Sequence, residues 1–318
     1  MSQINSIWQL YLFYGAIIGI GMGGAFVPLA STVARWFVKR RSMMTGIALS
    51  GLGAGNFIVP PVVSWLIYTY DWRSSYIIVG ALVLVFVVLA AQFLKRNPGQ
   101  IGQLPDGKNK VEEPALKSGF DGFSLKEAAL TRQFWILFAM FFCVGFYLFV
   151  ITVHIVPHAM DLGISAATAA NILATVGGLS IVGRVVLGMV ADRIGNRPVY
   201  IIGFAMMSAA TFLLVPIRTE VWSLYLFAAI FGFASSGPGS LTSPLVAELF
   251  GMRSHGIIFG VIDIGFTIGG SLGPFVAAYI FDTMGSYQVS FLVCAAVSAL
   301  GLILAALLRP TKRPEMKT

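Results

Sequence analysis

Nine long apolar runs constrain this chain more than any other feature of its sequence. Each run has about 20 residues or more, the length that an α-helix needs to cross the hydrocarbon core of a bilayer. The chain is 57% hydrophobic and 11% charged, whereas a soluble domain carries about 25% charged residues. Because lipid offers no partner for open backbone groups, every run is expected to be a helix. The sequence therefore predicts an all-α integral membrane protein with nine transmembrane helices and excludes a soluble fold.

The predicted spans form a group of three and a group of six, with a polar segment between them. They cover residues 7–33, 42–70 and 74–94, and then 133–157, 166–190, 198–217, 221–246, 255–281 and 286–308. In the polar segment, Ser124 and Glu127 have the spacing of a capping box, which predicts a short helix before the fourth span. We predict four parts: an incomplete N-terminal bundle of three helices (1–95), a cytoplasmic linker (96–132), a C-terminal six-helix bundle (133–308) and a cytoplasmic tail (309–318).

Positive charge lies almost entirely in one set of alternate loops. That set holds 18 of the 21 Lys and Arg residues, the opposite set holds Arg73 and Arg218, and Arg184 lies inside a span. Positively charged loops stay in the cytoplasm, so we expect the amino terminus outside and the carboxyl terminus inside a plasma membrane. Because the net charge of +8 reports topology, nucleic acid is not expected as a partner.

The sequence offers no chemistry of an enzyme. The two cysteines, Cys143 and Cys294, lie inside apolar runs and can form neither a disulfide framework nor a metal cluster. No ATP-binding motif or catalytic triad is visible. We therefore expect no enzyme activity, no cofactor and no metal ion, and a monomer.

The first three spans also resemble the last three in the positions of their small residues. With a shift of 213 or 214 residues, eight positions of the first group, among them Gly46, Gly55 and Pro60, meet the same residue type in the second group. Internal repeats are typical of transporter folds. The first three spans are thus predicted to be a copy of the last three.

A charged turn follows the fifth predicted span. It reads Gly188-Met-Val-Ala-Asp192-Arg193-Ile-Gly195-Asn-Arg197 and resembles the signature loop of the major facilitator superfamily, which implies two bundles that rock about a central site. Asp192 is expected to lie against the positive amino end of a helix in the other bundle. Arg193 and Arg197 would bind carbonyl or acidic groups, while Gly188 and Gly195 permit close approach and a tight turn. The motif would then act as a latch on the cytoplasmic side; the alternative is an ordinary charged turn.

A second pattern, between the first and second spans, narrows the resemblance. Residues 36–51 look like the signature that enters the fifth helix of monocarboxylate transporters and of the neighbouring oxalate–formate antiporter branch. The matching residues are Phe37, the basic cluster of Lys39, Arg40 and Arg41, and Gly46 and Gly51. The pattern departs from the family at Trp36, Met43, Met44 and Ser50.

The resemblance covers nearly the whole chain apart from the linker. It implies twelve helices, of which the first span here is the fourth, so that three helices are absent before Met1. Either the start is misassigned or the sequence is a fragment, or the gene is truly truncated and its product can be inactive.

Arg184 is the leading candidate for substrate binding. A charge this deep in an apolar helix needs a partner or a water-filled cavity. The resemblance matches it to an arginine that binds the substrate carboxylate, and a guanidinium offers a planar fork to such a group. The alternatives are a structural ion pair and a side chain that extends to the cytoplasmic edge.

Other polar residues in the spans are candidates with weaker support. Asp263 could carry a proton, could pair with Arg184, or could be an acid at a helix end. His154 could contact substrate or relay protons, or simply be a paired group at the membrane interface. Asn171 and Ser180 could line the same cavity as Arg184. The oxalate–formate branch has a lysine about one turn after Asp263, and its absence here favours a singly charged anion.

These observations favour a secondary carrier of a small organic anion, and of a monocarboxylate in particular. Alternating access would be coupled to a proton or to a counter-anion. Two alternatives remain: a carrier of drugs or other small solutes in the same superfamily, and a truncated membrane remnant that transports nothing.

Overall fold

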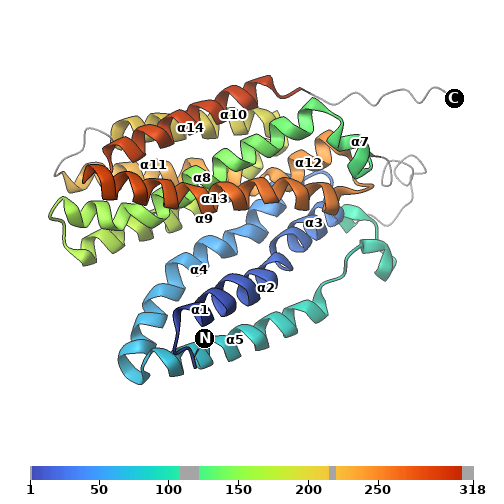
Figure 1. The fold of residues 1–318 in the computed structure, drawn as a ribbon. Helices are drawn as coiled ribbons and strands as arrows, with labels where there is room; N and C mark the ends of the chain where they lie inside the picture. The colour runs from blue at the N-terminus through green and yellow to red at the C-terminus, as the bar shows by residue number, and fades with distance from the viewer. Residues whose placement is uncertain (1, 108–121, 215–219, 310–318) are drawn as a thin grey trace.

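The structure is a computed structural model, and it describes residues 2–107, 122–214 and 220–309. Within these residues, nine helical segments are long and apolar enough to cross a membrane, and no strand is present. Figure 1 shows a larger group of helices, α8 to α14, beside a smaller group, α1 to α5. The predicted all-α membrane fold with nine spans is confirmed. The middle of the predicted linker and nearly all of the predicted tail lie outside the described residues.

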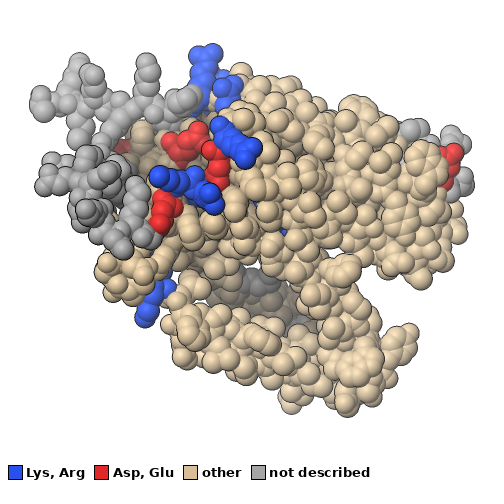
Figure 2. All heavy atoms as spheres, turned by 180° about the vertical axis from the view of Figure 1, so that it is seen from behind, with Lys and Arg blue, Asp and Glu red and all other residues tan. Residues whose placement is uncertain are grey.

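Most charged side chains lie near the ends of the helices, and Arg184 and Asp263 are exceptions inside spans. In the view of Figure 2, Lys and Arg gather with Asp and Glu at one end of the molecule, a small acidic patch lies at the other end, and the long middle is almost free of charge. This distribution is what a bilayer requires, because an unpaired charge is costly at membrane depth. Figure 2 also shows that the surface is hollowed between the larger and the smaller bundle.

The first predicted span consists of several helical pieces. It begins with α1 (Ile7–Leu10), the π-helical η1 (Tyr11–Ile18) and α2 (Gly19–Gly23), and continues after a turn as α3 (Phe26–Trp36). The next two spans are α4 (Arg41–Tyr70) and α5 (Trp72–Phe93). Asp71 separates them and caps α5, because its carboxylate accepts a hydrogen bond from the Ser74 amide at 2.9 Å.

The segment between the bundles contains little regular structure in its described part. Two 3-10 turns, η2 (Pro98–Ile101) and η3 (Pro105–Gly107), come first, and α7 (Leu125–Ala129) precedes the second bundle. The predicted capping box is confirmed: the Ser124 amide donates to Glu127 Oε2 at 2.7 Å, and the Glu127 amide donates to Ser124 Oγ at 3.3 Å.

The second bundle contains the remaining six spans. They are formed by α8 (Arg132–Asp161), α9 (Ala166–Ile194), α10 (Asn196–Leu214), α11 (Val221–Ser240) with α12 (Thr242–Phe250), α13 (His255–Met284) and α14 (Gln288–Leu307). The seventh span, predicted as one helix, is therefore divided at Leu241. The buried core lies almost entirely here: among the buried residues of the main core, Ala30 alone comes from the first three spans.

The helix bounds agree with the predicted internal repeat. Both α4 and α13 have 30 residues, and a shift of 214 residues places the first and last residues of α4 on those of α13. The same shift places Pro60 of α4 on Pro274 of α13, and each proline lies inside its helix.

Several helix pairs join the bundles. The main one is α4 against α9, and α3 also packs against α13. Small residues permit the first contact, as is common between membrane helices. A Cβ atom built on Gly46 of α4 would collide with the carbonyl oxygen of Arg184 on α9, and one built on Gly188 would lie 2.8 Å from the carbonyl oxygen of Ser42.

This close approach makes a prediction for two glycines of the same helix. Gly46→Ala should lower the stability of the protein in detergent by about 1–3 kcal/mol, because the added methyl group overpacks the contact between bundles. Gly51→Ala is the matched control, since a Cβ atom there would meet nothing within 4 Å. Thermal unfolding followed by tryptophan fluorescence measures both, and equal midpoints would contradict the packing described here.

Candidate anion site and inner contact between the bundles

The carboxylate of Asp192 lies at the amino end of α4, in the other bundle. Its Oδ1 accepts a hydrogen bond from the Ser42 amide at 2.9 Å, and its Oδ2 accepts one from the Met43 amide at 3.0 Å. The first amides of a helix have no partner inside it, and Arg40 at the N-cap of α4 makes no side-chain cap. Asp192 thus caps a helix of the neighbouring bundle, where the helix dipole also favours negative charge.

A chain of polar side chains extends this contact. Ser42 Oγ donates to Asn196 Oδ1 at 2.9 Å, and Asn196 Nδ2 donates to Glu248 Oε2 at 2.8 Å. Ser42 and Asn196 are both buried, so the bond between them is shielded from competing water, whereas Glu248 is exposed. The two bundles are therefore joined at this end by hydrogen bonds that link α4, α10 and α12.

The other residues of the charged turn have separate environments. Arg197 anchors the turn to the end of α14: its Nε donates to the Ala305 carbonyl at 3.3 Å and its Nη2 to the Ala306 carbonyl at 2.6 Å. Arg193 is exposed at the end of α9. Gly195 has a φ of 91°, a backbone conformation that favours glycine. Gly188 gives α9 its close approach to α4.

The basic cluster 39–41 shapes the turn between α3 and α4. Arg41 Nε donates to the carbonyl oxygens of Ala34 at 3.0 Å and Phe37 at 3.2 Å. Lys39 and Arg40 are exposed. The amides of Val38 and Lys39 donate to the two carboxylate oxygens of Asp106 at 3.0 and 3.2 Å, so a residue of the linker holds this turn.

Arg184 lies at the same helix contact, farther into the membrane. Its Nη1 donates to Ser180 Oγ at 3.2 Å, and that hydroxyl donates to the Gly177 carbonyl at 2.7 Å. A Cβ atom built on Gly53 of α4 would lie 3.0 Å from Arg184 Nη1. The guanidinium therefore lies between the bundles. Within the described part of the chain, no acidic side chain contacts it.

Asp263 lies apart from Arg184. It is on α13, which packs mainly against α8, whereas Arg184 faces α4. The Oδ1 atom of Asp263 is buried and has no hydrogen-bond partner among the described residues. Asp263 is also more than two turns from the start of α13. An ion pair with Arg184 and a position at the helix end, two roles expected for this residue, are thus not observed.

His154 and Asn171 are not brought to Arg184. His154 is buried inside the second bundle, where its Nε2 lies 3.1 Å from the Pro274 carbonyl and its Nδ1 lies 3.4 Å from the Tyr287 hydroxyl. Asn171 is exposed and lies roughly 20 Å along α9 from Arg184, given the rise of 1.5 Å per residue. Of the residues expected beside Arg184, the structure brings only Ser180 to it.

Sequence reasoning missed three residues of this region. In the sequence, Gly53 is one of many glycines in an apolar run. Asn196 lies in the charged turn and Glu248 lies near the end of a span, and neither belongs to a motif of its own. Their importance depends on contacts between segments far apart in the chain, such as Asn196 with Glu248. For Gly53, the one available signal is the helical register, which places it two turns after Gly46 and therefore on the same face of the helix.

The comparisons with known proteins agree with this architecture. The family model of the Major Facilitator Superfamily matches residues 1–188 and 155–318. The chain belongs to the major facilitator superfamily. It is therefore a member of a family of transporters rather than of enzymes.

Individual members of the superfamily refine this placement. The chain is 27% identical over 339 residues to monocarboxylate transporter 12 of Rattus norvegicus, covering 98% of this chain and 68% of the relative. It is 28% identical over 298 residues to monocarboxylate transporter 13 of Bos taurus, covering 93% of this chain and 66% of the relative. The chain thus spans about two thirds of the length of these relatives.

A solved structure shares the fold. A crystal structure of the fucose:proton symporter FucP of E. coli has a TM-score of 0.68 and 16% sequence identity, and the match covers 96% of this chain and 78% of that chain. At this identity the likeness concerns the fold alone. The member of the superfamily described here thus has the bundle architecture of a solved transporter.

Proposed function

We propose that this protein is a secondary carrier of a small organic anion, and of a monocarboxylate in particular. The observation that carries the proposal is the Arg184 guanidinium, which lies in an apolar helix between the bundles and contacts Ser180 but no acidic group in the described chain. A positive charge kept at this depth is costly unless an anion reaches it. The names of two relatives, monocarboxylate transporters 12 and 13, agree with an anionic cargo.

The geometry suits a carboxylate. A guanidinium can donate two parallel N–H···O bonds to the two oxygens of one carboxylate, which gives both strength and orientation. Ser180 accepts one N–H of Arg184 and holds the guanidinium toward α4. The bound anion would neutralise the charge, and a neutral site costs less to enclose when the bundles rock.

The inner contact supplies the second part of the mechanism. Asp192 at the amino end of α4 and the Ser42–Asn196–Glu248 chain close the basic end of the molecule. We propose that these bonds form the cytoplasmic gate and that they break when the carrier opens inward. Alternating access requires a gate of this kind on each side of the central site.

Uptake into proteoliposomes tests the proposal. The purified chain is reconstituted and offered labelled formate, acetate, lactate and pyruvate, with fucose and an amphipathic cationic dye as controls. We expect saturable uptake of at least one acid that the others inhibit. Uptake of the dye or sugar alone would refute the proposed cargo, and no uptake of any compound would favour a membrane protein that does not transport.

Asp263 is the candidate for proton coupling. Its buried Oδ1 has no partner in the described structure, so a proton bound there would remove an unpaired charge from the membrane. In the parent protein, an inward gradient of about one pH unit should increase uptake about tenfold at equilibrium. Asp263→Asn should abolish this increase, while exchange of labelled for unlabelled acid continues. Asp282→Asn, an exposed acid of the same helix, is the matched control. Gradient-driven uptake that survives Asp263→Asn would assign the proton to another group, whereas a parent protein that does not respond to the gradient would assign the coupling to a counter-anion.

A further inference from the structure

A cavity of about 500 Å³ lies where α3, the segment after α5 and the start of α13 meet. Three arginines from these three segments line it: Arg35, Arg96 and Arg253. Among the described residues that line this cavity, none is acidic. We call it the basic cavity.

Among the described residues, the positive groups of the basic cavity have no negative partner. Arg35 Nη1 donates to Asn97 Oδ1 at 3.0 Å, a neutral acceptor, and Arg35 lies close enough to Arg96 for the two charges to repel. The Oγ atom of Ser31, a lining residue, is buried without a hydrogen-bond partner in the described chain. The first turn of α13 also borders the cavity, and Ser254 at its N-cap makes no side-chain cap.

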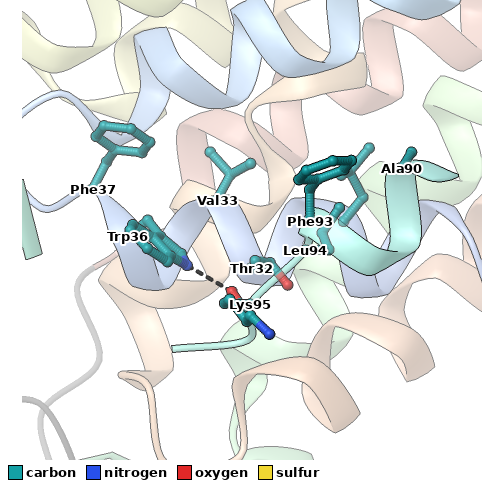
Figure 3. A pocket seen from close by; sticks show the side chains of 9 residues that line it. Thr32, Val33, Trp36, Phe37, Ala90, Phe93, Leu94 and Lys95 are labelled. Carbon is teal, nitrogen blue, oxygen red and sulfur yellow. Dashed lines mark hydrogen bonds between the residues drawn. The ribbon is translucent and has the colours of Figure 1, made fainter. Parts of the chain in front are cut away.

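An apolar groove continues from the basic cavity. It has a volume of about 290 Å³, lies between α3 and α5, and shares Thr32 and Leu94 with the cavity. Figure 3 shows its lining, with Val33, Phe93 and Leu94 about the groove and the Trp36 indole directed to the Lys95 carbonyl. That Trp36 Nε1 to Lys95 oxygen bond is 2.7 Å long. Trp and Lys at this position are typical of the boundary between lipid and water.

We propose that the basic cavity and the apolar groove together bind one anionic phospholipid of the cytoplasmic leaflet. The phosphodiester would accept hydrogen bonds from Arg35, Arg96 and Arg253, and an acyl chain would lie between α3 and α5. Basic pockets between helices on the cytoplasmic side are a recognised form of lipid headgroup site, and a helix amino end favours phosphate oxygens. The adjoining groove selects a lipid over a free phosphate ester. This inference stands apart from the carrier function, since none of these residues contacts Arg184.

Native mass spectrometry of the purified chain tests the proposal with two lipids that have the same acyl chains. Dioleoyl phosphatidylglycerol carries a net negative charge, whereas dioleoyl phosphatidylcholine is neutral overall. We expect about tenfold tighter binding of one phosphatidylglycerol, in line with the attraction of an anionic headgroup to several arginines. Equal binding of the two lipids would overturn the proposal.

Variants locate the site and identify the ligand. A triple variant of the cavity arginines should remove the preference for phosphatidylglycerol; it combines Arg35→Gln, Arg96→Gln and Arg253→Gln. A control triple variant removes three exposed charges elsewhere and should keep the preference; it combines Lys126→Gln, Arg132→Gln and Arg309→Gln. Arg96→Gln alone, at an exposed position, should weaken binding about fivefold, from about 1 kcal/mol per arginine, without changing the unfolding midpoint.

Ala90→Phe, which fills the groove, separates the lipid from a free anion. This substitution should weaken phosphatidylglycerol binding, and glycerol 3-phosphate should not displace the lipid. A preference that survives the triple arginine variant would overturn the site. If glycerol 3-phosphate displaced the lipid and Ala90→Phe did not change lipid binding, the cavity would be assigned to a soluble phosphate ester instead.

Discussion

Arg184→Lys is expected to lower carboxylate uptake by about ten- to a hundredfold while the protein still inserts and folds. Lysine keeps the charge but offers a point donor instead of a planar fork, so a bidentate contact is lost. A hydrogen bond to a charged group contributes about 1.5–3 kcal/mol, which corresponds to this range. Initial rates of uptake at several substrate concentrations in proteoliposomes provide the measurement.

The control for this substitution is Arg132→Lys, an exposed arginine at the start of α8. It makes the same chemical change outside the contact between the bundles and should leave uptake unaltered. Unchanged kinetics in Arg184→Lys would remove Arg184 from the site. Size-exclusion chromatography would show any loss of folded protein in Arg184→Lys. If the Arg184–Ser180 contact were structural, Ser180→Ala would cause the same loss.

Asp192→Asn is expected to open the cytoplasmic side. The substitution removes a charged acceptor from the Ser42 and Met43 amides, at a cost of about 1.5–3 kcal/mol. The closed state would lose population relative to the inward-open state by about ten- to a hundredfold. Nitroxide labels in place of Lys39 and Arg193, two exposed residues on opposite sides of the contact, report the change by pulsed electron paramagnetic resonance.

The expected distance distribution has one short population in the parent protein and an added longer one in Asp192→Asn. Asp282→Asn, an exposed acid of α13, should keep the parent distribution. A single short population in Asp192→Asn would show that the capping bonds do not hold the gate.

Much of the fold could be predicted from the sequence because a bilayer imposes a simple rule. The nine spans follow from the length and polarity of the runs, and most helix ends lie within a few residues of the predicted bounds. The break at Leu241 could not be predicted, because the apolar pattern runs across it. The nearby Pro238 does not mark the break, since it lies inside α11. Composition reports burial in lipid, but it does not report local backbone geometry.

The candidate site was only partly accessible to sequence reasoning. Asp192 could be placed at a helix amino end because a motif and the electrostatics of helix ends point to the same contact. The partners of Asn196 could not be predicted, since its bonds to Ser42 and Glu248 join three separate helices. His154 is a similar case: only the fold shows that Pro274 and Tyr287 lie beside its ring.

Equilibrium binding of a carboxylic acid and of its amide is the most direct test of the central claim. Lactate and lactamide have nearly the same shape, and only lactate can neutralise the Arg184 guanidinium. The account predicts that the purified protein binds labelled lactate, or whichever acid it transports, about a hundredfold more tightly than the amide, from about 3 kcal/mol of charged hydrogen bonding. Equal affinities for the acid and the amide would contradict it.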